Sequence, residues 1–237
     1  MTNTLVLFCG GPAIYGGVPK PLQKLRTGET LIERYLNFIN VEAPSTIILL
    51  VDQSFEHVFS TLLDGYKSSA ELILFSCPDN SSTLAKLKVF LDTYSLPDQP
   101  VMFSYPDIYI DGQIDQPNHA DIRLADKAFI SYIPVVSRFP RLVIDAYNDS
   151  VQGISFHSSP VPANPLYVFG GHLLVRTSLM TSFVNTFLAE TSLVAPSLEF
   201  DLFFWLTNTL RMHSMPIHGR WIQADSPRDL ETILTLT

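Results

Sequence analysis

Short apolar runs alternate with amphipathic stretches through the first half of the chain. The apolar runs have the length of buried parallel strands and occupy residues 5–9, 46–51, 71–75 and 101–104. Between them, apolar residues recur at helical spacing, which predicts helices over 31–39, 55–63 and 82–94, the first with Thr30 as its N-cap. Strands that alternate with helices in this way predict an open, mainly parallel sheet covered by helices.

The second half of the chain has a different pattern, in which strands follow one another through turns. Strands are predicted over residues 129–136, 141–145, 151–156 and 167–175, with a hairpin turn at Asn148 and Asp149. Helices over 178–186 and 199–212, a short strand over 215–222 and a last helix from Pro227 complete the pattern. We therefore predict a single α/β domain, 1–237, whose mixed, mostly parallel sheet is shared by two halves, 1–115 and 116–237.

Composition and charge narrow the class of protein. With 46% hydrophobic and 16% charged residues, the 237-residue chain has ample material for a core. Its net charge of −8 argues against a nucleic-acid backbone or an anionic membrane as the main partner. No apolar run is long enough to span a bilayer, and the start lacks the basic and apolar regions of a signal peptide. Cys9 and Cys77 make no disulfide framework and no Cys/His cluster has zinc spacing, so a cytoplasmic location is expected.

The loop after the first strand, GGPAIYGGVPKPL over residues 10–22, is the main candidate for chemistry. Its glycines let the backbone approach a phosphate closely; they are Gly10, Gly11, Gly16 and Gly17. Exposed backbone amides and the ammonium of Lys20 would together form an anion cradle. The loop matches neither a Walker loop nor a GxGxxG fingerprint, and a surface loop without function is the alternative. Gly10 and Asp107 both follow predicted strands, at the sheet edge where open α/β folds bind ligands.

The loop and the following GETLIER (28–34) resemble the N-terminal signature of the nucleotidyltransferases that make nucleotide sugars and related activated compounds. The resemblance continues along the chain in residues 101–107, 139–145, 151–156, 169–175, 199–201 and 221–230. It implies a GT-A or Rossmann-like fold, with 1–115 binding the nucleotide and 116–237 the sugar phosphate. It also implies a transferase that moves a nucleoside monophosphate from a nucleoside triphosphate to a sugar-1-phosphate or similar acceptor, releasing pyrophosphate, for polysaccharide or glycoconjugate biosynthesis.

The resemblance also assigns residues to roles. It places Mg²⁺ between Asp107 and Asp225 and puts Lys20 on the phosphates, which makes these three the catalytic set. The residues implied in nucleotide binding are Gly10, Gly11, Gly16, Gly17, Lys20 and Ser82, and those implied in acceptor binding are Gly170, Gly171 and Glu199. Structural alternatives stay open for several of them: a helix cap for Asp225 and for Ser82, and a β-bulge for Gly170 and Gly171.

The chain departs from the family pattern at charged positions. The loop arginine that binds the triphosphate falls at Ile14 or Tyr15, and Pro106 stands where a glycine precedes the metal aspartate. The Glu-Lys-Pro that holds the sugar phosphate is Ser-Ser-Pro at 158–160, and a further glycine is Pro140. The basic residues that could substitute are Lys24, Arg26, Arg138 and Arg141. Without a substitute, binding of a polyanion would be weaker.

Three functions therefore compete. The first is an active nucleotidyltransferase with a divergent site, and Tyr105 before Pro-Asp favours CTP as its nucleotide. The second is a catalytically impaired homologue that binds a nucleotide or nucleotide sugar, or regulates an active partner. The third, a glycosyltransferase of related fold, ranks last because Asp107 and Asp111 do not form the Asp-x-Asp of those enzymes. A homo-oligomer is left open.

Overall fold

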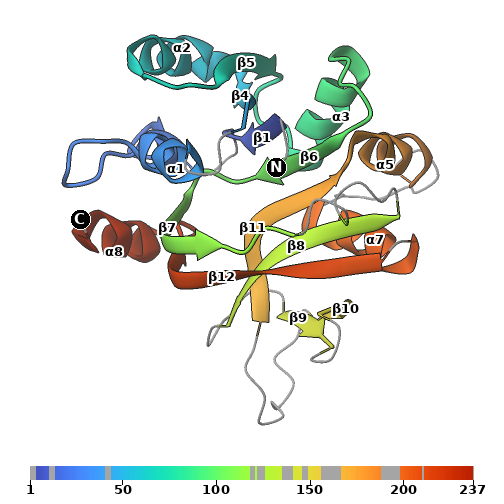
Figure 1. The fold of residues 1–237 in the computed structure, drawn as a ribbon. Coiled ribbons are helices and arrows are strands. Elements are labelled where there is room, and N and C mark those ends of the chain that lie inside the picture. Colours follow the sequence, from blue (N-terminus) through green and yellow to red (C-terminus); the bar gives the residue numbers. More distant parts are fainter. Residues whose placement is uncertain are drawn as a thin grey trace. The chain divides into compact units, whose positions relative to one another are not determined.

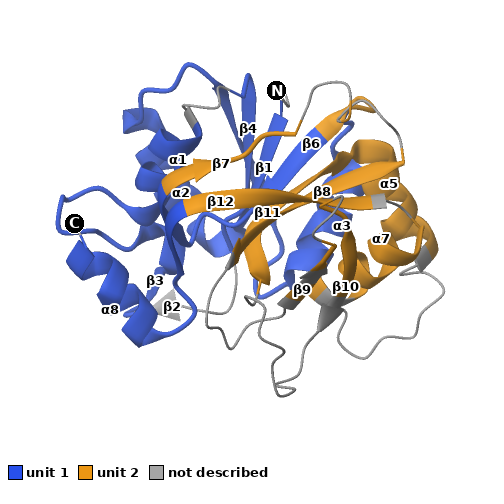
Figure 2. Cartoon of the chain, turned by 60° about the horizontal axis from the view of Figure 1, so that its bottom comes forward, with its two compact units in different colours: residues 1–96, 101–111, 219–237 blue, residues 97–100, 112–218 orange. Residues whose placement is uncertain are grey.

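The computed structural model describes residues 4–10, 14–40, 44–117, 121, 126–134, 141–145, 149–155, 167–187, 198–209 and 211–236 (Figure 1). The chain divides into two compact units (Figure 2). Unit 1 comprises residues 1–96, 101–111 and 219–237, and unit 2 comprises 97–100 and 112–218. Unit 1 thus includes residues 219–237, which the sequence-based division at residue 115 groups with the second half.

A parallel sheet forms the centre of unit 1. Its strands, in spatial order, are β5 (Glu71–Cys77), β4 (Thr46–Asp52), β1 (Thr4–Phe8) and β6 (Pro100–Ser104). The helices that connect them are α1 (Leu31–Asn40), α2 (Glu56–Gly65) and α3 (Thr83–Thr93). Every residue of β1 is buried, as expected for a strand with sheet neighbours on both sides and helices over its faces. The predicted alternation of strands and helices is confirmed.

The order of these strands creates a switch point between β1 and β6. From β1 the chain moves outward to β4 and then β5, and it returns to β6 on the other side of β1. In open α/β sheets, ligands bind in the crevice outside the carboxyl ends of the strands at such a reversal. The topology therefore predicts a ligand site where β1 and β6 end.

Short elements after β1 shape the glycine-rich segment. β2 (Ile14–Tyr15) and β3 (Val18–Pro19) form a hairpin, and Gly16 and Gly17 make its turn with φ of 61° and 79°. Two successive positive φ values are typical of the tight turns that glycine favours. The hairpin leads into the 3₁₀ turn η1 (Lys20–Leu22), and a second 3₁₀ turn, η2 (Gln53–Phe55), follows β4.

Helix α1 begins with a reciprocal cap. The Glu33 backbone N–H donates to Thr30 Oγ1 at 3.2 Å, and the Thr30 N–H donates to Glu33 Oε2 at 2.6 Å. This capping box satisfies two backbone donors that a helix start leaves unpaired. The predicted N-cap at Thr30 is confirmed.

Unit 2 contains a mixed sheet and two helices, α5 (Thr177–Ser182) and α7 (Phe203–Thr209). Its strands include β8 (Lys127–Pro134), β9 (Arg141–Ile144), β10 (Val151–Ser155) and β11 (Tyr167–Arg176). β11 is antiparallel to β8 and β9, whereas β12 (Arg211–Gln223) is parallel to β8. π-helical turns, η3 (Phe183–Phe187) and η4 (Leu198–Leu202), adjoin the two helices. Asp149 has a φ of 53° between β9 and β10, as a turn there requires, and Asn148 lies outside the described residues.

Two strands differ from the sequence-based prediction. β7 (Ile108–Ile114) was not predicted, and β12 starts at Arg211, so the predicted helix 199–212 is wrong at Arg211 and Met212. The predicted strand 215–222 lies within β12, although it contains Pro216, which lacks a ladder donor, and Gly219, which weakens a strand. Pro216 is accommodated through its carbonyl, which accepts a hydrogen bond from the Asp115 N–H at 2.9 Å.

No helix within the described ranges is both long and apolar enough to cross a membrane. The α/β fold class, with a mostly parallel sheet flanked by helices, is as predicted.

Candidate nucleotide-phosphate site

A cavity of about 170 Å³ opens at the switch point of unit 1, where β1 and β6 end. Its lining residues come from the ends of β1, β6 and β12, from the segment around η1 and from the start of α3: Phe8, Cys9, Gly10, Pro19, Lys20, Pro21, Thr83, Tyr105, Asp107 and Gln223. The structure therefore brings Gly10, Lys20 and Asp107, three of the residues singled out from the sequence, to one cavity.

Lys20 lies between two carboxylates. Its Nζ donates a hydrogen bond to Asp107 Oδ2 at 3.3 Å and lies 3.7 Å from Asp225 Oδ1. The side chains of Lys20 and Asp107 are 12% and 15% exposed, and that of Asp225 is 31% exposed. Pro19 and Pro21, which flank Lys20, fix the backbone φ on both sides of it. The predicted catalytic set thus forms one charged cluster at the cavity.

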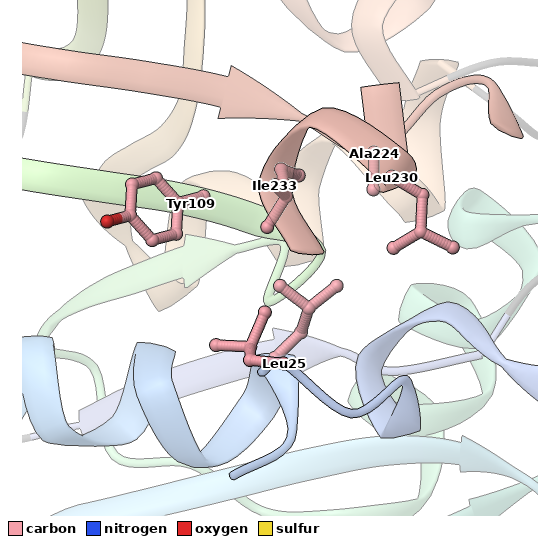
Figure 3. Close-up of a cluster of buried hydrophobic side chains, with 6 residues drawn as sticks. Leu25, Tyr109, Ala224, Leu230 and Ile233 are labelled. Carbon is pink, nitrogen blue, oxygen red and sulfur yellow. The ribbon is translucent and has the colours of Figure 1, made fainter. Parts of the chain in front are cut away.

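An apolar cluster in unit 1 explains why these three side chains meet. The sequence neighbours of the charged residues are apolar: Leu25 follows Lys20, Tyr109 follows Asp107 and Ala224 precedes Asp225. Leu25, Tyr109 and Ala224 pack into one buried cluster (Figure 3). Leu230 and Ile233 of α8 (Pro227–Leu236) complete the packing. The Ala224 N–H also donates to the Asp107 carbonyl at 2.9 Å. Three distant segments are therefore joined a few residues away from the charged groups that they carry.

The cluster changes the ionisation of Asp107. Burial raises the pKa of its carboxyl above the ordinary value, Lys20 opposes this rise, and the negative charge of Asp225 adds to it. Burial and the charge of Asp107 also raise the pKa of the neighbouring Cys9 thiol well above its ordinary range. A thiol with a raised pKa is a poor nucleophile, so Cys9 is a lining residue rather than a reactive one.

The carboxylates fit a magnesium ion that is bound together with a phosphate. Asp107 Oδ1 is buried and has no hydrogen-bond partner among the other described residues, so one oxygen is left for a further ligand. The described part of the chain contains no group of three or more His, Cys, Asp or Glu side chains that could hold a metal ion. Mg²⁺ needs only one or two carboxylates when phosphate oxygens and water complete its shell. The donor set therefore suits Mg²⁺ with its substrate better than a resident metal.

The structure decides one open alternative for Asp225. The residue that caps α8 is Ser226, whose Oγ accepts from the Asp229 N–H at 3.2 Å and donates to Asp229 Oδ2 at 2.6 Å. The capping alternative for Asp225 is therefore wrong, and its carboxylate is directed to Lys20 instead.

Ser82 does act as a helix cap. Its Oγ accepts a hydrogen bond from the Ala85 N–H at 3.2 Å, at the start of α3. Thr83, the next residue, lines the cavity. The contact of Ser82 with a nucleotide remains a prediction.

The other predicted glycines of unit 1 have different positions. Gly16 and Gly17 form the exposed turn of the β2–β3 hairpin, and Gly11 lies outside the described residues. Gly10 lines the cavity from one side and packs tightly on the other: a Cβ there would lie 2.8 Å from Lys86 Cε and 2.9 Å from Asp52 Oδ1. Both atoms belong to buried side chains that have little room to shift.

Gly10→Ala is therefore expected to destabilise the protein by about 1–3 kcal/mol, the usual cost of overfilling a packed core. Chemical denaturation monitored by circular dichroism measures the change. Gly65→Ala in α2 is the matched control, because a Cβ at Gly65 meets nothing within 4 Å. Equal stability of the two variants would show that Gly10 is not confined by Lys86 and Asp52.

The predicted acceptor residues lie in unit 2. The register of β11 against β8 shifts between Phe169 and Leu173, so the stretch that contains Gly170 and Gly171 departs from regular pairing, in keeping with the β-bulge alternative. A Cβ at Gly170 would lie 2.8 Å from Ser131 Oγ, and Gly171 has a φ of 92°. Glu199 is half-buried in η4. Acceptor binding by these residues remains a prediction, and Arg138, Pro140 and residues 158–160 lie outside the described residues.

Phe8 and Gln223 line the cavity but were not singled out from the sequence, whereas Tyr105 was named there for the choice of nucleotide. Phe8 and Tyr105 form an aromatic wall with ring centroids 5.4 Å apart, and Gln223 lies two residues before Asp225. Their one sequence signal is position, since each stands at or just after the end of a strand. Lys24 and Arg26, named above as substitute cations, are exposed and do not line the cavity.

No protein-family model matches the chain, and no curated protein matches it by sequence. Solved structures do match it over nearly its whole length. HddC from Yersinia pseudotuberculosis has a TM-score of 0.72 at 15% identity over 98% of both chains, and its complex with GMP-PN gives 0.71. The inositol-1-phosphate CTP transferase of T. maritima gives 0.69 at 11% identity, over 98% of this chain and 96% of that one.

A Bacillus anthracis protein described as a glucose-1-phosphate thymidylyltransferase, solved with sucrose, gives a TM-score of 0.74 at 15% identity over 98% of this chain and 94% of its own. At these identities the likeness shows the fold. The chain has the fold of sugar-phosphate nucleotidyltransferases, as the resemblance in the sequence predicted.

Proposed function

We propose that the protein transfers a nucleoside monophosphate from a nucleoside triphosphate to a phosphorylated sugar or similar acceptor, with release of pyrophosphate. The observation that carries this proposal is the charged cluster of Lys20, Asp107 and Asp225, in which Lys20 and Asp107 line a cavity at the switch point of this fold. A lysine and two carboxylates are the groups that a metal-bound polyphosphate needs.

The reaction requires little covalent chemistry from the protein. A phosphate oxygen of the acceptor attacks the α-phosphorus, its bond to phosphorus forms, and the bond to the bridging oxygen breaks as pyrophosphate leaves with its electron pair. Positioning and charge stabilisation account for most catalysis in such transfers. Lys20 would contact phosphate oxygens and stabilise the charge that develops on them. Asp107 and Asp225 would hold Mg²⁺, which neutralises phosphate charge when bound.

The size of the cavity indicates which part of the substrate it takes. Pockets that enclose a whole ligand of drug size measure roughly 300–1,000 Å³. At about 170 Å³, this cavity suits the phosphates and the group next to them. The acceptor would extend beyond it.

The names of the structural neighbours suggest substrates for a first screen. They include a CTP transferase acting on inositol-1-phosphate and a thymidylyltransferase acting on glucose-1-phosphate. We therefore propose a sugar or cyclitol phosphate as the acceptor. CTP is the first nucleotide to test, because Tyr105 before Pro-Asp favours it in the sequence and both Tyr105 and Asp107 line the cavity. The product would be an activated sugar or related compound for glycoconjugate or polysaccharide assembly in the cytoplasm.

A second function, nucleotide binding without turnover, is favoured by one observation. Of the described residues that line the cavity, Lys20 is the one cation, whereas a triphosphate carries several negative charges. A homologue with weakened catalysis would keep the fold and bind the nucleotide, or regulate an active partner.

One experiment separates the two functions. Pyrophosphate release is measured with CTP, UTP, dTTP, GTP and ATP against a panel of sugar and inositol phosphates, with Mg²⁺ or with excess EDTA. We expect Mg²⁺-dependent release for at least one pair. Thermal stabilisation by a nucleotide with no release across the panel would instead establish the binding function. If no nucleotide stabilises the protein and no pair releases pyrophosphate, both functions are overturned.

A further inference from the structure

Lys86 of α3 and Asp52 at the end of β4 form an ion pair directly behind Gly10. The side chain of Lys86 is 0% exposed and that of Asp52 is 6% exposed. The Lys86 ammonium donates to Asp52 Oδ1, to the Ser81 carbonyl at 3.0 Å and to Ser81 Oγ at 3.1 Å. An ammonium has three donors, so these three acceptors satisfy it completely. Lys86 therefore acts on the protein itself and not on a ligand.

This ion pair connects the structural surroundings of two uncharged residues that line the cavity, Gly10 and Thr83. Gly10 forms one wall, and its backbone rests against Lys86 Cε and Asp52 Oδ1 so closely that a Cβ would not fit. Thr83 also lines the cavity and stands two residues after Ser81, which accepts hydrogen bonds from Lys86 through both its carbonyl and its hydroxyl. The Lys86 side chain therefore links the backbone at Gly10 to the turn that precedes Thr83.

A second contact holds the same turn from its exposed side. The Ser54 N–H donates to Asp79 Oδ1 at 2.8 Å, which ties the turn before α3 to the segment that follows β4. Asn80 has a φ of 57°, in the left-handed region, so the turn has a strained conformation that needs such support. The turn is thus held at Asp79 by an exposed hydrogen bond from Ser54, and at Ser81 by hydrogen bonds from the buried Lys86 ammonium.

The charges of the cavity are separated by this arrangement. Lys20, Asp107 and Asp225 form the charged side. At the Gly10 and Thr83 walls, the charges of Lys86 and Asp52 neutralise one another behind the surface. The phosphates of a nucleotide fit the first side, and an uncharged hydrogen-bonding group, such as a base or ribose, fits the second.

We propose that Lys86 is a positioning residue, which sets the spacing of the Gly10 and Thr83 walls for the nucleoside part of the nucleotide. This inference rests on the proposed nucleotide function. It separates two effects: loss of Lys86 weakens nucleotide binding and leaves the chemical step intact, because the charged side of the cavity is untouched.

The test uses the double variant Asp52→Asn with Lys86→Met. Removing both charges together avoids a buried carboxylate without its cation, which would endanger folding. We expect KM for the nucleotide to rise about tenfold with kcat within about twofold of wild type, the signature of lost uniform binding. Lys88→Met is the matched control, since Lys88 lies on the same helix but pairs with Asp92 at the surface, and KM should not change.

Asp79→Ala provides a second, exposed substitution that leaves the buried pair intact. It is expected to raise KM about threefold, with kcat unchanged, because it removes the other fastening of the turn. Calorimetric nucleotide affinity is measured for all variants, so the comparison does not depend on turnover.

The outcomes separate the two proposals. If wild type binds nucleotide without turnover, the catalytic proposal fails, while a tenfold affinity loss in the double variant still supports the role of Lys86. If wild type turns over and neither variant changes KM or affinity, the role of Lys86 is wrong and the function stands. A fall in kcat at constant KM would also overturn it. A wild-type protein that binds no nucleotide overturns both.

Discussion

Asp107→Asn is expected to reduce Mg²⁺-dependent pyrophosphate release by at least about 10³-fold, because a neutral amide cannot replace a metal-binding carboxylate. Asparagine has nearly the same shape as aspartate, so the packing around Tyr109 and the Ala224–Asp107 backbone hydrogen bond should persist. The loss should therefore appear in kcat while the far-ultraviolet circular dichroism stays unchanged.

The same substitution should not destabilise the metal-free protein at neutral pH. Burial raises the pKa of the Asp107 carboxyl, so folding favours the protonated form. The protonated Asp107 carboxyl therefore contributes to the stability of wild type. This contribution is complete below the unfolded-state pKa and is lost as the pH rises through the folded-state pKa. The amide in the variant cannot ionise, so the stability of the variant relative to wild type should increase as the pH rises through this range.

Thermal unfolding in EDTA between about pH 3 and 8 measures this difference, from below the ordinary pKa of an aspartate upward. Asp64→Asn, an exposed change on α2, is the control for both activity and stability. Retained Mg²⁺-dependent turnover in Asp107→Asn would contradict the assignment of Asp107 as a metal-binding residue.

Lys20→Met has the second largest expected effect. Removing one group that stabilises charge in the transition state costs about 10²–10³-fold in kcat. Lys20 is the cavity-lining cation of the described structure, so we expect a loss in this range, together with a higher KM for the nucleotide. Steady-state pyrophosphate release with the best substrate pair measures both constants.

The variant should also have a changed pH dependence of stability. Lys20 lowers the pKa of Asp107, so its removal should raise that pKa further. The loss of stability with rising pH should then extend to higher pH than in wild type, in EDTA. Lys67→Met, at an exposed position of the same unit, controls for loss of a positive charge. A kcat equal to that of wild type would exclude a phosphate role for Lys20.

Sequence periodicity predicts the sheet of unit 1 well because its strands are continuous apolar runs. β1 and β4 are almost entirely buried and β5 is half-buried along most of its length, so apolar residues dominate all three strands and the pattern is unambiguous. β7 and β12 lack this signal. β7 contains Asp111 and Gly112, which are residues typical of turns, and β12 was predicted as a strand over 215–222 but not at its start.

Site residues were predictable from the sequence where the local segment alone determines their position in the fold. Lys20 follows the glycine-rich hairpin directly, and Asp107 follows a buried strand. The role of Lys86 was not predictable, because a lysine in a helix normally reaches solvent and its acceptor, Asp52, lies on a distant strand end. Whether Asp225 was a cap or a site residue also depended on tertiary structure, since its neighbour Ser226 could cap the helix equally well.

Unit 1 is built from segments that the ribosome makes far apart in time. Asp107 and Lys20 are synthesised before residues 112–218 of unit 2, whereas Asp225 and α8 emerge after them. The apolar cluster of Leu25, Tyr109, Ala224 and α8 therefore closes only late in synthesis. A nascent chain that has completed both earlier segments still lacks one of the two carboxylates, so it cannot assemble the proposed metal site before residues 219–237 have folded back.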